Sequence, residues 1–233
     1  MEARLMALAL VTCGPAYEPI DGVRRITNES TGEIGTILSE SLSAFGFEVL
    51  CLRGEMSRHP APKNARVVSF STNGSLMEIL EKLPSQPAAF FHAAALSDFS
   101  VRKIQGTEER RKIRSGIREL QITLRPAEKI LPRLRTVFPR ALIVGWKYEL
   151  DGTRSDLISL ARQQMENSET DACVVNGSAY GEGFGFLARG REHLRHSIDK
   201  TELAAFLAAW SLQAINSQES AKDDQPPPSQ SGQ

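Results

Sequence analysis

The sequence has no excess of either charge, few cysteines and no long apolar run. Its 28 Lys and Arg residues balance 28 Asp and Glu residues, so no global field favours DNA or an acidic membrane surface as a partner. The three cysteines form no CxxC pair, and no His/Cys spacing typical of a zinc site is present. No stretch approaches the roughly 20 apolar residues of a transmembrane helix. We therefore expect neither a nucleic-acid nor a membrane partner, and any recognition of anions must be local.

The cysteines and the N-terminus favour a cytoplasmic protein. Cys13, Cys51 and Cys173 each lie in or beside an apolar run, which is typical of reduced, packed thiols. Residues 5–13 follow a basic residue and also resemble a short secretory signal that ends at a cysteine. Glu2 in the flank and the shortness of the run argue against that alternative.

The composition is sufficient for one folded domain followed by a polar tail. A chain of 233 residues with 41% hydrophobic content can bury a sizeable core. We assign residues 1–215 to a single domain. Residues 216–233 are polar and end in DDQPPPSQSGQ. Their apolar content is too low to offset the entropy lost on ordering, so we expect a disordered tail.

Apolar runs and helical patterns alternate along the chain. Strands buried on both faces are expected at residues 7–11, 47–52, 65–70, 88–95, 141–146 and 172–175. Helices are expected at residues 32–45, 75–83, 127–137 and 154–166. This alternation predicts an α/β, three-layer Rossmann-like fold with a mainly parallel sheet, and a binding crevice beyond the carboxyl ends of its strands.

Residues 97–126 break this alternation. They have no helical period and are rich in Lys and Arg before a strand-like segment at residues 119–124 (ELQITL). We interpret them as a basic, mobile excursion from the domain.

The segment RRITNESTG, residues 24–32, lies between the first strand and the first long helix. Ser30 or Thr31 can cap that helix, Gly32 allows a ligand to approach the backbone, and the free N–H groups of the first turn favour an anion. Arg24 adds a bidentate donor for phosphate or carboxylate. A polar, well-capped loop without a ligand remains an alternative interpretation.

Three separated motifs resemble one family. They are TCGPAYEPIDGVRRITNESTGEIG from residue 12, AAALSDFSV at 93–101 and KIRSGIRELQITLRPAEKIL at 112–131, followed by IVGWKYELD at 143–151 and DACVVN at 171–176. In this order they resemble phosphopantothenoylcysteine synthetase (phosphopantothenate–cysteine ligase), the ligase domain of the DFP/CoaBC family. The resemblance runs from about residue 7 to 207.

The resemblance implies a reaction in coenzyme A biosynthesis. Such enzymes join 4'-phosphopantothenate to cysteine through an acyl-nucleotidylate, consuming CTP or ATP with Mg²⁺. By position, Asn28 is implied to hold the acyl-nucleotidylate and Lys112 to close over the triphosphate. Asp98 is implied at the nucleotide and metal region, although an aspartate after a strand end is more often a turn cap, and Lys112 could simply belong to a solvated loop.

The resemblance also implies the binding residues. These are Gly14, Arg24, Ser30, Thr31, Gly32, Ala94, Ala95, Asp98, Trp146 and Asn176. Trp146 is implied to contact the nucleobase, although packing in the core is an equal alternative. Asn176 has a similar alternative in a plain glycine-rich turn. His92 lies in an apolar strand, and we interpret it as a core histidine.

The sequence departs from the family pattern at several positions. The turn usually reads Gly-Gly-Thr, but here Pro15 removes a backbone donor and Ala16 removes a hydroxyl. Glu33 stands where Lys or Arg is common. Extra residues at 105–111 leave Lys103 as an alternative to Lys112. The choice between CTP and ATP also stays open.

The resemblance implies a homodimer that pairs through a strand-rich arm, with residues 119–124 as the candidate edge. Fusions in the family carry a flavin-binding decarboxylase, but this chain fits the ligase part alone, so we expect no flavin. Two rival functions remain. One is a non-catalytic nucleotide-binding homologue, and the other is an NAD(P)-dependent Rossmann oxidoreductase, which the lack of a G-x-G-x-x-G loop disfavours.

Overall fold

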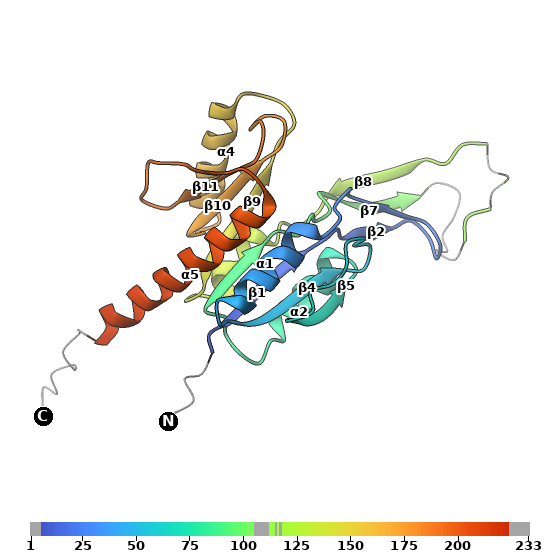
Figure 1. Ribbon diagram of the computed structural model, residues 1–233. Coiled ribbons are helices and arrows are strands. Elements are labelled where there is room, and N and C mark those ends of the chain that lie inside the picture. Colours follow the sequence, from blue (N-terminus) through green and yellow to red (C-terminus); the bar gives the residue numbers. More distant parts are fainter. Residues whose placement is uncertain (1–5, 105–111, 115, 117, 224–233) are drawn as a thin grey trace, which may run out of the picture.

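An eight-stranded sheet forms the centre of the computed structural model, which describes residues 6–104, 112–114, 116 and 118–223 (Figure 1). Its strand order is β12-β11-β10-β9-β6-β1-β4-β5. The six strands from β10 to β5 are parallel to their neighbours, whereas β11 and β12 pair antiparallel at one edge. The bounds are β1 Leu8–Cys13, β4 Glu48–Gly54, β5 Arg66–Phe70, β6 Ala89–His92, β9 Leu142–Tyr148, β10 Ala172–Asn176, β11 Phe184–Ala188 and β12 Arg195–Ser197.

Side chains alternate between two cores, one on each face of the sheet. On β1, Val11 packs into a cluster beneath α1 and α5, whereas Leu10 packs into a second cluster beneath α2 and α3. Helix α4 covers the second face further along, over Cys173 and Val175 of β10. The helices are α1 Glu33–Ala44, α2 Asn73–Glu81, α3 Leu134–Val137 after the 3-10 turn η1 Leu131–Arg133, α4 Arg154–Asn167 and α5 Lys200–Asp223. The predicted three-layer α/β fold is thus confirmed.

Two small antiparallel pairs project from this body on the same side (Figure 1). The first joins β2 Tyr17–Pro19 to β3 Arg25–Thr27, and the second joins β7 Phe99–Ile104 to β8 Ile122–Pro126. We call the second pair the arm. Both strands of the arm lie within residues 97–126, where we expected a basic excursion, and the excursion is a regular strand pair at Phe99–Ile104 and Ile122–Pro126. Residues 105–111, 115 and 117 of the same stretch lie outside the described residues.

The C-terminal helix runs past residue 215, the predicted end of the domain. Helix α5 was not among the expected helices, yet Leu203, Ala204, Leu207 and Ala208 pack along it into the first core. It continues to Asp223, so the predicted disordered tail is wrong for residues 216–223. Residues 224–233 lie outside the described part. The helix expected at 127–137 is also shorter, because it begins only with η1 at Leu131.

The three thiols are buried and free, as predicted for a protein with reduced cysteines. Burial raises the pKa of Cys173 to about 12, so this thiol stays protonated at neutral pH. Among the described residues no helix is long and apolar enough to cross a membrane.

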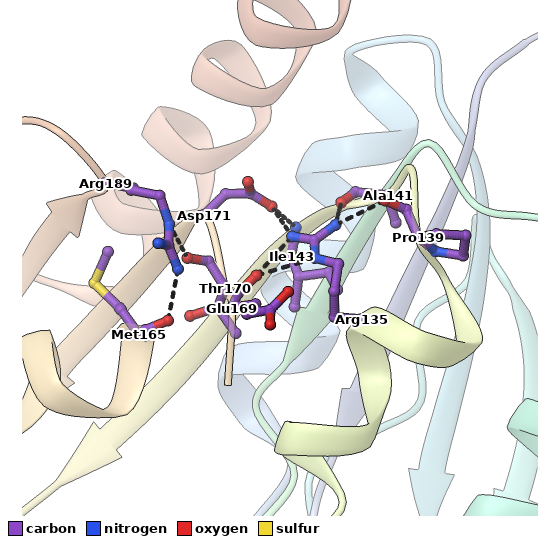
Figure 2. Close-up of polar contacts among 9 residues, drawn as sticks. All are labelled: Arg135, Pro139, Ala141, Ile143, Met165, Glu169, Thr170, Asp171 and Arg189. Carbon is purple, nitrogen blue, oxygen red and sulfur yellow. Dashed lines mark hydrogen bonds and ion pairs between the residues drawn. The ribbon is translucent and has the colours of Figure 1, made fainter. Parts of the chain in front are cut away.

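Arg135 of α3 ties together the segments that lead into β9 and β10 (Figure 2). Its guanidinium donates to Oδ2 of Asp171 and to the carbonyl oxygens of Pro139, Ala141 and Glu169. The same Oδ2 accepts from the backbone N–H of Ile143 at 2.7 Å. The planar fork of arginine can serve several acceptors at once, whereas an ammonium group cannot.

Arg135→Lys should therefore lower the free energy of unfolding by about 1.5 kcal/mol, since partly buried carbonyls lose charge-assisted hydrogen bonds. Urea unfolding at neutral pH measures the change. Arg133→Lys is the matched control, because Arg133 is 41% exposed and, among the described residues, its side chain pairs with the carboxylates of Glu81 and Glu128. For this variant we expect a loss of about 0.5 kcal/mol or less. Equal losses in the two variants would contradict a special role for Arg135.

Candidate functional site

The parallel strands place their carboxyl ends along one edge of the sheet. Gly14 follows β1, Ala94 and Ala95 follow β6, and Asn176 ends β10. The extensions of β1 and β6 remain paired, because the N–H of Ala95 donates to the carbonyl of Gly14 at 3.0 Å and the N–H of Ala16 donates to that of Ala95 at 3.0 Å. This edge is where an open α/β sheet binds its ligands.

Gly14 and Gly32 lie together at this edge, and both need to be glycine. Their φ angles are +75° and +80°, a region that side chains disfavour. A Cβ at Gly14 would lie 1.8 Å from Oγ of Ser57, and a Cβ at Gly32 would lie 3.0 Å from the same atom and 3.6 Å from Cα of Gly14. Backbone from two loops therefore packs closely around the side chain of Ser57, and we call Gly14 and Gly32 together the cradle.

The start of α1 differs from the prediction. Its N-cap is Gly32, which makes no side-chain capping bond, so the expectation that Ser30 or Thr31 is the cap residue is wrong. The left-handed conformation of Gly32 gives the chain its entry angle instead. The Thr31 hydroxyl accepts from the N–H of Glu33 at 3.3 Å, and the Ser30 N–H donates to the carbonyl of Asn28 at 3.0 Å.

Glu33, a departure from the family pattern, is offset by a cation. Lys200 of α5 donates to its carboxylate, and this contact is the main cause that lowers the pKa of Glu33. The carboxylate thus has a partner on α5, which reduces the negative charge that it presents to the start of α1.

Asn28 connects the loop before α1 with the loop after β6. Its Nδ2 donates to the carbonyl of Leu96 at 2.8 Å, and its side chain is exposed. The preceding Thr27 donates through its hydroxyl to the carbonyl of Ala16 at 2.7 Å. The structure therefore brings Asn28 next to the segment that holds Ala94 and Ala95.

Asp98 is paired with Lys129, a residue to which the sequence assigned no role. The Lys129 ammonium donates to Oδ1 of Asp98, and both side chains are 66% exposed. In the described part of the chain no group of three or more His, Cys, Asp or Glu residues could hold a metal ion. A lone exposed carboxylate still fits Mg²⁺ that is bound chiefly by substrate phosphates, because such sites commonly use one or two carboxylates.

Trp146 and Asn176 lie on neighbouring strands near the same edge. Trp146 is partly buried and packs against the first core, which supports the packing role that the sequence left open. Asn176 is half-buried, and its Oδ1 is enclosed without a hydrogen-bond partner among the described residues. An enclosed, unpaired amide oxygen can accept from a ligand.

Arg24 and Lys112 lie beside the β2–β3 pair. Arg24 donates to Oδ2 of Asp21 and, at 3.2 Å, to the carbonyl of Ile113. Lys112, which precedes Ile113 in the chain, is exposed. No contact of the described residues joins Lys112 to Asn28. Lys103 lies within β7, where its backbone pairs with Thr123.

His92 at the end of β6 is buried, as expected for a core histidine. Its Nδ1 lies 2.8 Å from the Thr12 hydroxyl, and burial lowers its pKa to about 4. A neutral imidazole therefore fills the space beneath the candidate site at neutral pH.

Sequence reasoning missed Asp21, Ser57 and Lys129. Asp21 could have been found as an Asx turn before Gly22, since its Oδ1 accepts from the N–H groups of Val23 and Arg24. Ser57 and Lys129 carry no such local signal.

Comparison with known proteins agrees with the geometry. Residues 6–208 match the family of the DNA/pantothenate metabolism flavoprotein C-terminal domain. The coenzyme A biosynthesis bifunctional protein CoaBC of Thermococcus kodakarensis is 34% identical over 172 residues, which cover 72% of this chain but only 40% of that protein. The chain thus spans less than half of this relative.

Two solved structures share the fold. The DNA/pantothenate metabolism flavoprotein of Streptococcus pneumoniae superposes with a TM-score of 0.76 at 23% identity, covering 91% of this chain and 99% of that one. A Cab2 mutant in complex with phosphopantothenate-cysteine gives a TM-score of 0.75 at 20% identity, covering 93% and 89%. From the match over residues 6–208, the chain belongs to the family of the DNA/pantothenate metabolism flavoprotein C-terminal domain.

Proposed function

We propose that the chain is a phosphopantothenate–cysteine ligase of coenzyme A biosynthesis. The observation that carries the proposal is the meeting of Asn28 with the loop after β6, at the same sheet edge as the cradle of Gly14 and Gly32. A neutral carboxamide suits an acyl phosphate, because it can donate to oxygen without adding charge. The family match and the relatives named for coenzyme A biosynthesis support the same assignment.

In this reaction the carboxylate of 4'-phosphopantothenate attacks the α-phosphorus of CTP or ATP, and pyrophosphate leaves. The amine of cysteine then attacks the acyl carbon, the nucleoside monophosphate leaves, and the amine loses a proton as the amide forms. Asn28 binds the acyl-nucleotidylate in both steps. The ammonium of Lys112 offsets the charge that develops on the departing pyrophosphate.

The remaining binding residues surround the nucleotide. The cradle of Gly14 and Gly32 and the start of α1, with Ser30 and Thr31, lie against its phosphates. Asn176 lies at the nucleobase, with its side-chain oxygen as an acceptor for an exocyclic amine of either CTP or ATP, whereas Trp146 keeps its packing role in the first core. Ala94 and Ala95 allow the ligand to contact the backbone after β6.

Asp98 is the residue that would contact Mg²⁺ brought by the nucleotide. Bound Mg²⁺ supplies charge neutralisation between the phosphates. Lys129 would then leave Asp98, and its ammonium would become available to a phosphate oxygen. The exposure of both side chains allows this exchange at little cost.

The proposal includes a homodimer and a place in the cytoplasm, and the arm supports the homodimer. Phe99 and Leu124 are 54% and 42% exposed on paired strands. Exposed apolar residues on a two-stranded sheet favour pairing with a second copy. Arg24 lies on the neighbouring β2–β3 pair, where it would also be close to such an interface.

The departures at the first turn are the reason to keep a non-catalytic homologue as the second candidate. Pro15 and Ala16 remove a donor and a hydroxyl that the family turn usually provides. Both residues are buried, however, and Ala16 packs in the second core. A hydroxyl at this position would therefore point into the protein interior and not at a ligand, which favours the enzyme.

The test is release of pyrophosphate from CTP and, separately, from ATP. We expect release that depends on added phosphopantothenate, followed by phosphopantothenoylcysteine when cysteine is added. The nucleotide that gives the higher kcat/KM settles the preference. No release with either nucleotide would overturn the ligase and leave the non-catalytic candidate, which nucleotide titration would then examine.

A further inference from the structure

Asp21 occupies an enclosed position between two segments far apart in the sequence. Its side chain has no exposed surface. Oδ1 accepts from the N–H groups of Val23 and Arg24, at 2.9 and 2.7 Å. Oδ2 accepts from the guanidinium of Arg24 and from the backbone N–H of Ile113 at 3.0 Å, 92 positions along the chain. Both carboxylate oxygens are therefore fully used within the protein.

Ile113 is held by its backbone and by its side chain. Its N–H donates to Asp21, and its carbonyl accepts from Arg24 at 3.2 Å. Its side chain is 5% exposed and packs with Val101 and Ile104 of the arm. A residue fixed in this way has a defined place, although it belongs to no helix or strand.

The ionised carboxylate is the form that makes these contacts. The amide of Ile113 contributes most to a pKa of Asp21 lowered to about 2, with further hydrogen bonds from Val23 and Arg24 and against the opposing effect of burial. Asp21 thus carries its charge throughout the range in which an enzyme works.

The exposed Lys112 is covalently joined to the anchored residue. Consecutive Cα atoms are about 3.8 Å apart, so the place of Ile113 limits where the Lys112 backbone can be. The flexible stem of lysine leaves its ammonium free to reach a ligand. Lys103 has no such dependence, because β8 holds its backbone.

We propose that Asp21 is a positioning residue, which through Ile113 holds Lys112 where its ammonium can serve the ligase reaction. Arg24 completes this Asp21 anchor, defined by Asp21, Arg24 and Ile113. The inference rests on the proposed function, and it selects Lys112 over Lys103 as the lysine that offsets the charge on the pyrophosphate. Asp21 touches no substrate and acts only through the segment that it fixes.

Asp21→Asn isolates the contact to Ile113. The carboxamide oxygen can still accept from Val23 and Arg24, so the turn is retained. The amide nitrogen in place of Oδ2 would face the N–H of Ile113 and the guanidinium of Arg24, and donors cannot pair with donors. We expect faster hydrogen exchange at the Ile113 amide, measured by mass spectrometry on native full-length protein, and kcat lower by at least about fivefold.

A double-mutant cycle then separates positioning from general damage. In a Lys112→Ala background Asp21→Asn should lower kcat by less than about twofold, because the residue that it positions is gone. In a Lys103→Ala background it should keep its full effect. Equal losses in the Lys112→Ala and wild-type backgrounds, or coupling to Lys103 in place of Lys112, would overturn the proposal.

Ile113→Ala provides the same test without changing a charge, should Asp21→Asn fail to fold. It shortens the buried side chain on the apolar side of the anchor, and its loss of kcat should also disappear in the Lys112→Ala background. If hydrogen exchange at the Ile113 amide is the same in Asp21→Asn as in the wild type, the Asp21 anchor is refuted but the ligase function is not. A wild-type chain that releases no pyrophosphate would refute the ligase function, and with it the role of Lys112, while the exchange result would stand independently.

Discussion

Asn28→Asp should lower the rate of amide formation at least about tenfold while the chain remains folded. In the proposed reaction the carboxamide donates to the oxygens of the acyl-nucleotidylate, and a carboxylate would replace that donor with a repelling charge. Loss of one such transition-state donor commonly costs tenfold or more in kcat. The measurement is phosphopantothenoylcysteine formation at saturating substrates, with the midpoint of thermal unfolding recorded for each variant.

Asn73→Asp is the matched control for this substitution. Its Nδ2 donates to the carbonyl of Ser97 at 2.9 Å. Ser97 directly follows Leu96, whose carbonyl accepts from Asn28. The same chemical change is thus made against the same loop but from α2, away from the cradle. A small effect in Asn73→Asp beside a large one in Asn28→Asp assigns the loss to the ligand contact. Equal losses would show that any charge against this loop is harmful, and Asn28 would lose its assigned role.

The parallel core is predictable from the sequence because burial on both faces leaves a simple pattern. Residues 7–11 are apolar without interruption, and in the structure Leu10 and Val11 belong to opposite cores. The same holds for Phe90 and Phe91 of β6. Such runs need no knowledge of their partners, since any neighbour in a covered parallel sheet provides the same apolar surroundings.

The strands outside this core cannot be found in the same way. β3 is exposed along its length, and β7 alternates buried Val101 with exposed Arg102 and Lys103. Their stability depends on the strand that pairs with them, and the partner of β7 is β8, across residues with no regular pattern. Helix α5 was not predicted for another reason. Its apolar and small residues are not confined to one face, so the sequence shows no clear amphipathic period.

The residues of the candidate site also fall into those that a local pattern predicts and those that depend on distant partners. Gly32, Asn28 and Arg24 stand in one local segment, so the motif and its resemblance to a family were sufficient to select them. Asp21 lies in the same motif, yet its partner Ile113 is 92 positions away, and Lys129 is 31 positions from Asp98. Contacts over such separations exist only once the fold brings the loops together. Their roles in catalysis stay predictions until the variants are measured.

His92 should make the protein less stable as the pH falls from about 6.5 to 5. The residue is 7% exposed, and burial lowers its pKa to about 4, from an ordinary value near 6.5. The unfolded chain therefore takes up a proton below about pH 6.5, whereas the folded protein does not until about pH 4. Stability is present in full above pH 6.5 and is lost as the pH falls towards 4. At pH 5 the expected loss is about 2 kcal/mol relative to pH 7.5.

The carboxylates with lowered pKa values change the stability at lower pH, and they do not contribute to its change between pH 7.5 and 5. Asp21 and Glu33 are stabilised in their charged forms, so their contributions are lost only as the pH falls below the ordinary carboxylate range near 4. The change in the free energy of unfolding between pH 7.5, 6 and 5, measured with urea, therefore comes mainly from the histidines. His92→Asn removes the titrating group, while its side-chain oxygen can take the place of Nδ1 and accept from the hydroxyl of Thr12.

We expect His92→Asn to lose most of the pH dependence between 7.5 and 5, even if it is less stable than the wild type at pH 7.5. The exposed His193 provides the control, and His193→Asn should keep the wild-type slope. Because the comparison uses the change with pH within each variant, a cavity left by the smaller side chain contributes equally at every pH and cancels. A wild-type slope in His92→Asn would show that the imidazole takes up its proton in the folded state, and that the space beneath the loop after β6 is open to water.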